Sequence, residues 1–205
     1  MITPVFIFTI FMLTLGPIKT VPAFFAMTQN QAPADARALA LKGAMVATAV
    51  SLVIALVMTA VASSWRVSAD DLRLAGGILL FVAAREMIGQ FTKPAPPQLA
   101  VPHRQPAVTP LAIPIIVTPW GVTAILFFAE LAYGDSKTLA SVIGILLVVM
   151  LLNLVGMLLA KQIIACVGMI TFQVLGWIFA VLQAGLAVDA VVTSLRNLAL
   201  FHPIS

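Results

Sequence analysis

Long apolar segments fill most of the chain and are separated by short polar breaks. Six such segments cover residues 1–28, 41–62, 72–90, 109–132, 138–160 and 163–192. A helix needs about 20 mainly apolar residues to cross a bilayer. The pattern therefore predicts an all-α integral membrane protein with six transmembrane helices and short loops.

The break at residues 91–108 differs from the others because it holds a cluster of prolines: Pro94, Pro96, Pro97, Pro102 and Pro106. Proline lacks a backbone N–H and clashes with the preceding helical turn, so helices end at such a cluster. We expect a linker here, between a first three-helix unit at residues 1–90 and a second at residues 109–205. The first segment has no basic leader and no small-residue cleavage site, which favours a retained span over a signal peptide.

Composition agrees with a membrane location and excludes several other classes. Hydrophobic residues make up 62% of the chain and charged residues only 9%, and a soluble domain cannot cover so much apolar surface. The net charge of +4 comes from scattered basic residues, without the clustered patch that nucleic-acid binding requires. The single cysteine, Cys166, excludes an intrachain disulfide.

The sequence lacks the motifs of catalysis and of cofactor binding. His103 lies in the proline-rich break and His202 lies near the C-terminus, so with one cysteine they give no metal-ligand spacing. There is no glycine-rich phosphate loop and no nucleophile elbow. We therefore expect no enzyme activity, no metal and no cofactor.

Basic residues favour one orientation in the membrane by a small margin. The breaks after the first, third and fifth segments carry Arg37, Lys42, Lys93, Arg104 and Lys161, and the other side carries Arg66, Arg73, Lys137 and Arg196. Positive charge is normally retained in the cytoplasm. The excess of five over four favours both termini on the periplasmic side.

The two halves of the sequence resemble each other. Pro17 in the first segment and Pro119 in the fourth lie 102 residues apart, and Gly77 and Gly176, in the third and sixth, lie 99 residues apart. Because three is odd, a three-helix unit used twice enters the membrane in opposite senses, which gives the inverted repeat of many secondary transporters. The alternative is that apolar helices resemble each other through composition alone.

Prolines and glycines interrupt the first and fourth segments at matching positions: Gly16 and Pro17, then Pro119 and Gly121, with Pro22 and Pro114 within five residues of them. Broken backbone inside a membrane is tolerated where it is packed in protein or lines a cavity. A half-helix that begins there directs free N–H groups and a partial positive charge at the cavity, which suits a carboxylate. The sequence predicts broken helices one and four around a pocket for a small zwitterion. The alternative is a pair of proline kinks that only shape the bundle.

Residues at and beside these breaks form the candidate substrate-binding site: Gly16, Pro17, Lys19, Thr20, Thr118, Pro119, Gly121 and Thr123. Charges within a span are costly and often functional, so Lys19 can hold a substrate carboxylate or, like Glu130 and Asp189, a coupling proton. Three alternatives stay open. Lys19 can snorkel to the interface, Glu130 and Asp189 can lie at headgroup level, and the threonines can bond to their own helices.

Four more polar residues in the spans have structural interpretations. Asn153 and Gln183 are amides in mid-span, and we expect them to form hydrogen bonds between helices, with a ligand contact as the alternative. Arg85 and Glu86 close the third segment, and we expect them at the membrane interface.

Four motifs occur in a distinctive order, at residues 16–24, 76–81, 110–114 and 176–180. With this order and spacing the chain resembles the MarC family of bacterial inner-membrane proteins. The stretches Gly-Gly-Ile-Leu-Leu-Phe and Pro-Leu-Ala-Ile-Pro are the most specific. The chain departs from the family pattern at both helix breaks, because it has Gly16 where the family usually has Asn or Asp, and Thr118 where the family usually has Gly.

The resemblance implies a location in the bacterial inner membrane and a relation to the wider superfamily of LysE-like amino-acid exporters. Some members of the family are described as transporters of small neutral amino acids, which agrees with a zwitterion site between two half-helices. The resemblance does not imply a role as a drug pump.

Together these features predict a secondary transporter or exporter of small neutral amino acids such as alanine and glycine. Its partners would be that solute, the lipid bilayer and a coupling proton or cation, with no nucleic acid, and a homo-oligomer stays open. The sequence contains no ATP-binding motif, so a gradient would supply the energy. The alternatives are a membrane scaffold or assembly factor that does not transport, or a transporter of another metabolite or ion.

Overall fold

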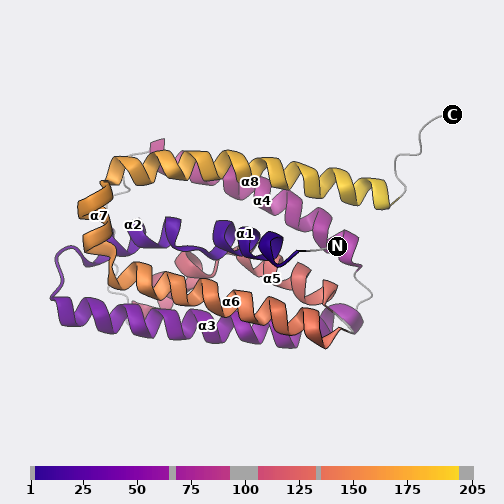
Figure 1. Cartoon of the computed structure of the whole chain (residues 1–205), viewed down its shortest axis with the longest axis horizontal. Helices are drawn as coiled ribbons and strands as arrows, with labels where there is room; N and C mark the ends of the chain where they lie inside the picture. Colours follow the sequence, from indigo (N-terminus) through magenta and orange to yellow (C-terminus); the bar gives the residue numbers. More distant parts are fainter. Residues whose placement is uncertain (1–2, 65–67, 93–105, 133–134, 199–205) are drawn as a thin grey trace.

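The computed structural model describes residues 3–64, 68–92, 106–132 and 135–198, and these residues form helices without strands. In chain order the helices are α1 (Pro4–Leu15), α2 (Pro17–Thr28), α3 (Pro33–Ser64), α4 (Ala69–Thr92), η1 (Ala107–Ile116), α5 (Pro119–Leu131), α6 (Ser136–Leu158), α7 (Ala160–Val167) and α8 (Met169–Asn197). They lie nearly side by side in an elongated bundle, and the short α7 crosses one end of it (Figure 1).

Several helices are long and apolar enough to span a bilayer. Among the described residues four pass this test: Pro4–Thr28, Pro33–Val57, Ser136–Leu158 and Ile170–Asn197. The count becomes five if the pair Ala107–Ile116 and Pro119–Ala129, bent by 63°, is one span. The third predicted span corresponds to α4, which is 24 residues long but lies outside these candidates. The all-helical membrane fold is confirmed, and the count of six spans stays a prediction.

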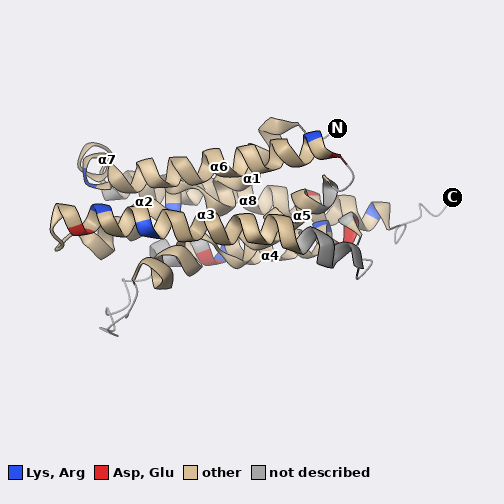
Figure 2. Ribbon diagram, turned by 90° about the horizontal axis from the view of Figure 1, so that it is seen from below, with Lys and Arg blue, Asp and Glu red and all other residues tan. Residues whose placement is uncertain are grey.

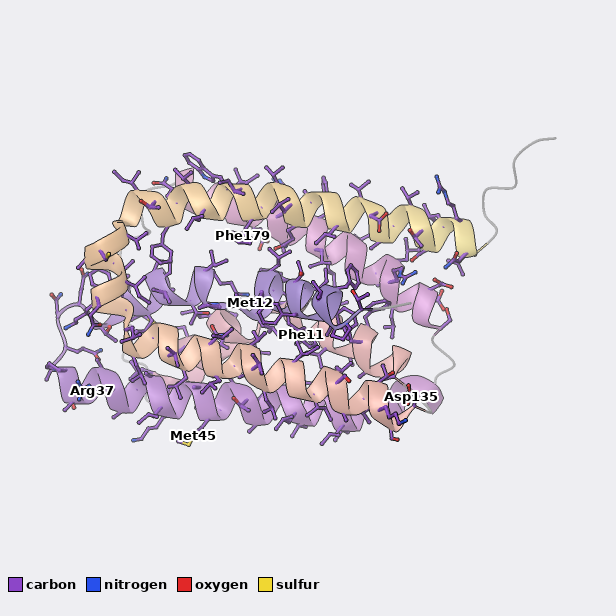
Figure 3. The ribbon with its side chains drawn as sticks, in the orientation of Figure 1. Phe11, Met12, Arg37, Met45, Asp135 and Phe179 are labelled. Atoms are coloured by element: carbon purple, nitrogen blue, oxygen red, sulfur yellow. The ribbon has the colours of Figure 1, made fainter. Side chains whose placement is uncertain are left out.

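The surface of the bundle is apolar between its two ends. Most Lys, Arg, Asp and Glu lie toward the two ends and a few lie nearer the middle, and long stretches of helix between them carry no charge (Figure 2). Large apolar side chains such as Val53, Leu151 and Val181 are more than half exposed. In Figure 3 Phe11 and Met12 lie inside the bundle, whereas Met45 points outward. An apolar surface of this kind suits contact with lipid, because lipid tails cannot form hydrogen bonds with exposed polar groups.

Two predicted boundaries were wrong. The second span was expected to begin at residue 41, but α3 begins at Pro33, where a proline at the first helical position and Asp35 in the first turn favour a helix start. The last segment was expected to be one helix, but Gly168 divides it into α7 and α8. Gly168 has a φ of +79°, which only glycine adopts readily.

The predicted linker at residues 91–108 falls mainly on residues 93–105, which lie outside the described part of the chain. At its borders, α4 continues to Thr92 and η1 already begins at Ala107. In η1, Thr109 and Ile113 are extended. Each precedes a proline, which disfavours the helical conformation of the residue before it.

Corresponding helices of the two halves run in opposite directions (Figure 1). The α1–α2 pair runs toward the end that α7 crosses, whereas η1 and α5 run away from it, and α3 and α6 are opposed in the same way, as are α4 and α8. The helices also pack reciprocally, because α3 contacts η1 and α5 while α6 contacts α1 and α2. Two units inserted in opposite senses would have this arrangement, although the inverted repeat itself stays a prediction. The start of α1 and the end of α8 lie at the same end of the bundle.

The bundle has a continuous apolar core from which one pair of helices is largely excluded. The core joins buried side chains of α1, α2, α3, η1, α5 and α6, with Phe11 and Phe128 in edge-to-face contact at 5.3 Å. In contrast, α4 and α8 pack mainly along each other. Buried small residues permit this close approach, among them Ala83, Ala84 and Ala187.

Gly77 lies at a close contact between α4 and α8. A Cβ atom at this position would lie 2.9 Å from the carbonyl oxygen of Ala187 and 2.7 Å from Cγ2 of Val191. We expect Gly77→Ala to lower the free energy of unfolding by about 1–3 kcal/mol, because the helices must separate. Reversible SDS titration of the purified protein measures this change.

Gly185 on α8 provides the matched control, because a Cβ atom there meets nothing within 4 Å. Gly185→Ala should leave stability unchanged or raise it slightly, since alanine is the better helix former. Equal loss of stability in both variants would contradict the close packing of α4 on α8.

Candidate functional site

Both predicted helix breaks are present at the predicted positions. In the first span α1 ends at Leu15, Gly16 is extended (φ −73°, ψ 172°), and α2 begins at Pro17. In the fourth, Val117 is extended (φ −89°, ψ 99°) and α5 begins at Pro119. Proline suits the first position of a helix because its missing N–H would have no partner there.

Side chains from outside α1 bind the carbonyl groups exposed by the first break. The carbonyl oxygen of Thr14 accepts hydrogen bonds from the Thr118 hydroxyl at 3.1 Å and from the Lys19 ammonium. The carbonyl oxygen of Leu15 accepts one from Nδ2 of Asn153 at 2.6 Å. The break is therefore compatible with a membrane, where unpaired backbone groups cost several kcal/mol.

Thr118 connects the two breaks. Its hydroxyl donates to Thr14 and accepts from the N–H of Gly121 at 3.1 Å and from Nζ of Lys19 at 3.3 Å. The bond from Gly121 caps the start of α5, and the bond to Thr14 caps the end of α1. In contrast, Thr20 and Thr123 donate to carbonyl groups of their own helices, at Gly16 and Pro119. The alternative of local bonding therefore holds for these two threonines and not for Thr118.

We expect Thr118→Val to lower the free energy of unfolding by about 1–3 kcal/mol, because the Thr14 carbonyl loses one of its two donors and the start of α5 loses its cap together. The control is Thr28→Val, since Thr28 is equally buried and donates only to Phe24 of its own helix. That variant should lose less than about 1 kcal/mol. Equal losses in SDS titration would contradict the role of Thr118 as the connection between the breaks.

A cavity of about 370 Å³ lies beside the two helix starts. This central cavity is lined by Leu13, Lys19 and Ala23 on one side, by Pro114, Ile115, Thr118, Pro119 and Trp120 on the second, and by Ala83, Glu86 and Gln183 of α4 and α8 on the third. Nζ of Lys19 lies 5.7 Å from the centre of the Trp120 ring, within reach of a cation–π interaction. A partly buried lysine therefore borders the cavity.

The first turns of α2 and α5 lie beside this cavity, because Lys19, Pro119 and Trp120 line it. Helix starts leave their first amides without an acceptor in the helix. Pro17 and Pro119 have no N–H, and Thr118 binds the amide of Gly121. The amides of Ile18, Lys19 and Trp120 remain in first-turn positions, where the helix dipole favours an anion.

The predicted site residues fall into three groups. Lys19, Thr118 and Pro119 line the central cavity. The residues that shape the breaks without lining it are Gly16, Pro17, Thr20 and Gly121. A Cβ atom on Gly121 would overlap Leu15 and approach the Thr118 hydroxyl to 3.0 Å. Thr123 and Asp189 line a different cavity of about 120 Å³, and the side chain of Glu130 lies outside the described residues.

Sequence reasoning missed Trp120 and Glu86 as part of the cavity. Glu86 was expected only at the interface, but it lines the central cavity one turn along α4 from Ala83. That spacing was the available signal, since residues three apart share a helix face. The amides behave as expected, because Gln183 donates to the carbonyl of Leu80 at 3.0 Å and Asn153 joins α6 to α1. Gln183 also lines the cavity.

Fold and site together define an integral membrane protein in which two interrupted helices meet beside a cavity that Lys19 and Thr118 line. The chain belongs to the MarC family: the model described as "MarC family integral membrane protein" matches residues 3–199.

Two curated relatives have only general names. A UPF0056 membrane protein of Pyrococcus abyssi is 31% identical over 114 residues, which cover 55% of this chain and 57% of the relative. A UPF0056 membrane protein of Buchnera aphidicola subsp. Schizaphis graminum is 28% identical over 111 residues, which cover 54% and 53%. The matches thus span about half the length of these relatives. No solved structure matches the chain.

Proposed function

We propose that this protein is a secondary transporter or exporter of small neutral amino acids, with alanine and glycine as the leading substrates. The observation that supports this proposal is the central cavity, where the starts of α2 and α5, a cationic Lys19 and a carboxylate at Glu86 border one space. Small-molecule sites usually occupy about 300–1,000 Å³, and a cavity of about 370 Å³ lies at the small end of that range.

The substrate carboxylate would bind at the helix starts. Lys19, Pro119 and Trp120 line the cavity from the first turns of α2 and α5, and free amides at helix starts favour an anion. A charge-assisted hydrogen bond to Lys19 would add to the dipole effect. The hydroxyl of Thr118 lies within 3.3 Å of Nζ of Lys19 and fixes the position of that group.

The substrate ammonium group would face the opposite wall, where α4 supplies Glu86 and α8 supplies Gln183. A carboxylate accepts hydrogen bonds from an ammonium group, and the amide oxygen of Gln183 can add one more. The mainly apolar remainder of the wall, with Leu13, Ala83 and Ile115, suits a small side chain and offers nothing to a charged one.

A gradient would supply the energy, because the sequence contains no ATP-binding motif. Lys19, Glu130 and Asp189 are the candidates for a coupling proton. We also place the protein in the inner membrane, with both termini in the periplasm, following the distribution of basic residues.

Counterflow in proteoliposomes tests this proposal. Vesicles loaded with unlabelled alanine should accumulate labelled alanine from outside, and excess unlabelled glycine should compete. Protein-free vesicles give the background. Absence of counterflow for both amino acids, in vesicles whose protein is folded by circular dichroism and size-exclusion chromatography, would contradict transport of this substrate class.

A second candidate function is a membrane scaffold or assembly factor, and one observation favours it. The carbonyl groups of Thr14 and Leu15 are already bound by protein side chains, so the breaks need no ligand to be stable. The two functions differ in thermal unfolding with a panel of amino acids, because a ligand that binds the folded state raises its melting temperature. The melting temperature of a scaffold should not change with any amino acid of the panel. Adding ions and other metabolites to the panel tests whether the protein transports a different solute.

A further inference from the structure

A second cavity of about 120 Å³ lies along the seam between α4, α8, α1 and α5. Its polar lining comes from three helices: Arg73 of α4, Thr123 of α5, and Asp189 and Thr193 of α8. Gly76 leaves room beside Thr123, because a Cβ atom on Gly76 would lie 3.2 Å from Cγ2 of that side chain.

The second cavity continues the line of the central cavity, because the same four helices line both at successive turns. On α1 the lining residues are Leu13 in the central cavity and Ile10 in the second; on α4 they are Ala83 and Leu80; on α5, Trp120 and Thr123; on α8, Gln183 and Leu186. Each pair is three residues apart, which is a rise of about 4.5 Å along a helix. The two spaces therefore follow each other along one seam.

A thin buried layer separates the two cavities. Leu13 and Leu80 are each 8% exposed and Gln183 is 2% exposed. Nε2 of Gln183 donates to the carbonyl oxygen of Leu80 at 3.0 Å, which holds α4 and α8 together at this level.

The second cavity carries charges of both signs on different helices. Arg73 is 24% exposed, lies over the Phe127 ring at 5.2 Å and is 3.8 Å from Asp70. Phe127 and Asp70 hold the guanidinium at the rim, and Asp189 stands on α8. An amino-acid zwitterion matches this pairing, because its carboxylate suits a guanidinium and its ammonium group suits a carboxylate.

We propose that the second cavity is another binding site for the transported zwitterion, with Arg73 on its carboxylate and Asp189 on its ammonium group. This inference rests on the proposed function. The solute would pass between the two sites through the layer of Leu13, Leu80 and Gln183, toward the end of the bundle where α1 begins and α8 ends. The solute would then occupy the second site just before it leaves, or just after it enters, at that end of the bundle.

The single cysteine of the chain makes this site testable by chemical labelling. In a Cys166→Ala background, Thr193→Cys places a thiol on the wall of the second cavity. We expect a charged methanethiosulfonate reagent to modify it about tenfold more slowly when alanine is present at about ten times its dissociation constant, because only unoccupied protein reacts. Ser136→Cys, which is exposed at the start of α6 and outside the second cavity, should react at the same rate with and without alanine.

Charge variants show whether alanine protects the Thr193→Cys thiol by binding in the second cavity or by binding in the central cavity. Adding Arg73→Gln to the Thr193→Cys protein should abolish the protection by alanine, whereas Arg196→Gln, on an exposed residue of α8, should keep it. Asp189→Asn repeats the test on an exposed side chain if Arg73→Gln does not fold.

The outcomes distinguish the second site from the proposed function. A melting temperature of the unmodified protein that does not respond to alanine would overturn both. A response to alanine without protection of Thr193→Cys, or protection that survives Arg73→Gln and Asp189→Asn, would overturn the second site and leave the central one.

Discussion

Lys19→Met is expected to weaken alanine binding about 10- to 100-fold. A hydrogen bond to a charged group contributes about 1.5–3 kcal/mol, and every 1.4 kcal/mol is about a factor of ten in affinity. Methionine keeps the length of the side chain and its contact with Trp120, but it removes the cation that borders the central cavity. Equilibrium binding of labelled alanine to the purified protein measures the effect.

Lys137→Met is the matched control, because Lys137 is exposed at the start of α6, away from both cavities. Its affinity for alanine should equal that of the unmodified protein. The Thr14 carbonyl retains its bond from Thr118 in Lys19→Met, so a folded variant is expected. Unchanged affinity in folded Lys19→Met would remove Lys19 from the site.

Gly16→Ala is expected to lower the free energy of unfolding more than Gly77→Ala or Gly185→Ala. A Cβ atom at this position would overlap the carbonyl oxygen of Met12 and lie 2.8 Å from its carbonyl carbon. Since the obstacle is backbone, the end of α1 must shift, and the bonds that hold Thr14 and Leu15 shift with it. We expect a loss of at least about 3 kcal/mol, the upper end for overpacking, together with loss of alanine binding.

Gly144→Ala controls for the substitution itself. Gly144 lies within α6, and a Cβ atom there meets nothing within 4 Å, so stability should stay the same or rise by up to about 1 kcal/mol. SDS titration of both variants gives the comparison. If Gly16→Ala is as stable as Gly144→Ala, the first break does not have the geometry described for it.

The helix breaks could be predicted from the sequence because their cause is local. Pro17 and Pro119 each lie one or two residues after an extended residue and suit the first position of a helix, since proline cannot donate to the preceding turn. Proline alone does not end a helix, because Pro22 lies inside α2. The same physics failed at Gly168, where an apolar run without proline gave no sign that the chain would turn between α7 and α8.

The composition of the site could be predicted only in part, because it depends on packing between distant segments. Thr20, Thr118 and Thr123 are alike in sequence, and only Thr118 bonds across to the other half of the chain. Asp189 and Thr123 lie in a separate cavity from Lys19. The positions of the two helix breaks in the sequence do not show which candidate residues line the central cavity and which line the second cavity.

Polar contacts at the first break stabilise it and also border the central cavity. Lys19 and Thr118 neutralise the carbonyl end of α1, and the same two side chains border the central cavity. A solute carboxylate would therefore meet groups already held in place, which lowers the cost of ordering them on binding. The polar cluster at the start of α6 is separate from this break. There the Thr138 hydroxyl and the Lys137 amide donate hydrogen bonds to the Asp135 carboxylate and lower its pKa.

The most direct test of the account is a solid-state NMR measurement on the protein in lipid with bound alanine labelled at its ¹³C-carboxylate. Dipolar contacts are expected from this carbon to ¹⁵Nζ of Lys19 and to the ¹⁵N amide of Trp120, with the Lys19 contact absent in Lys19→Met. A bound signal without either contact, or no bound alanine at all, would contradict a carboxylate site at the two helix starts.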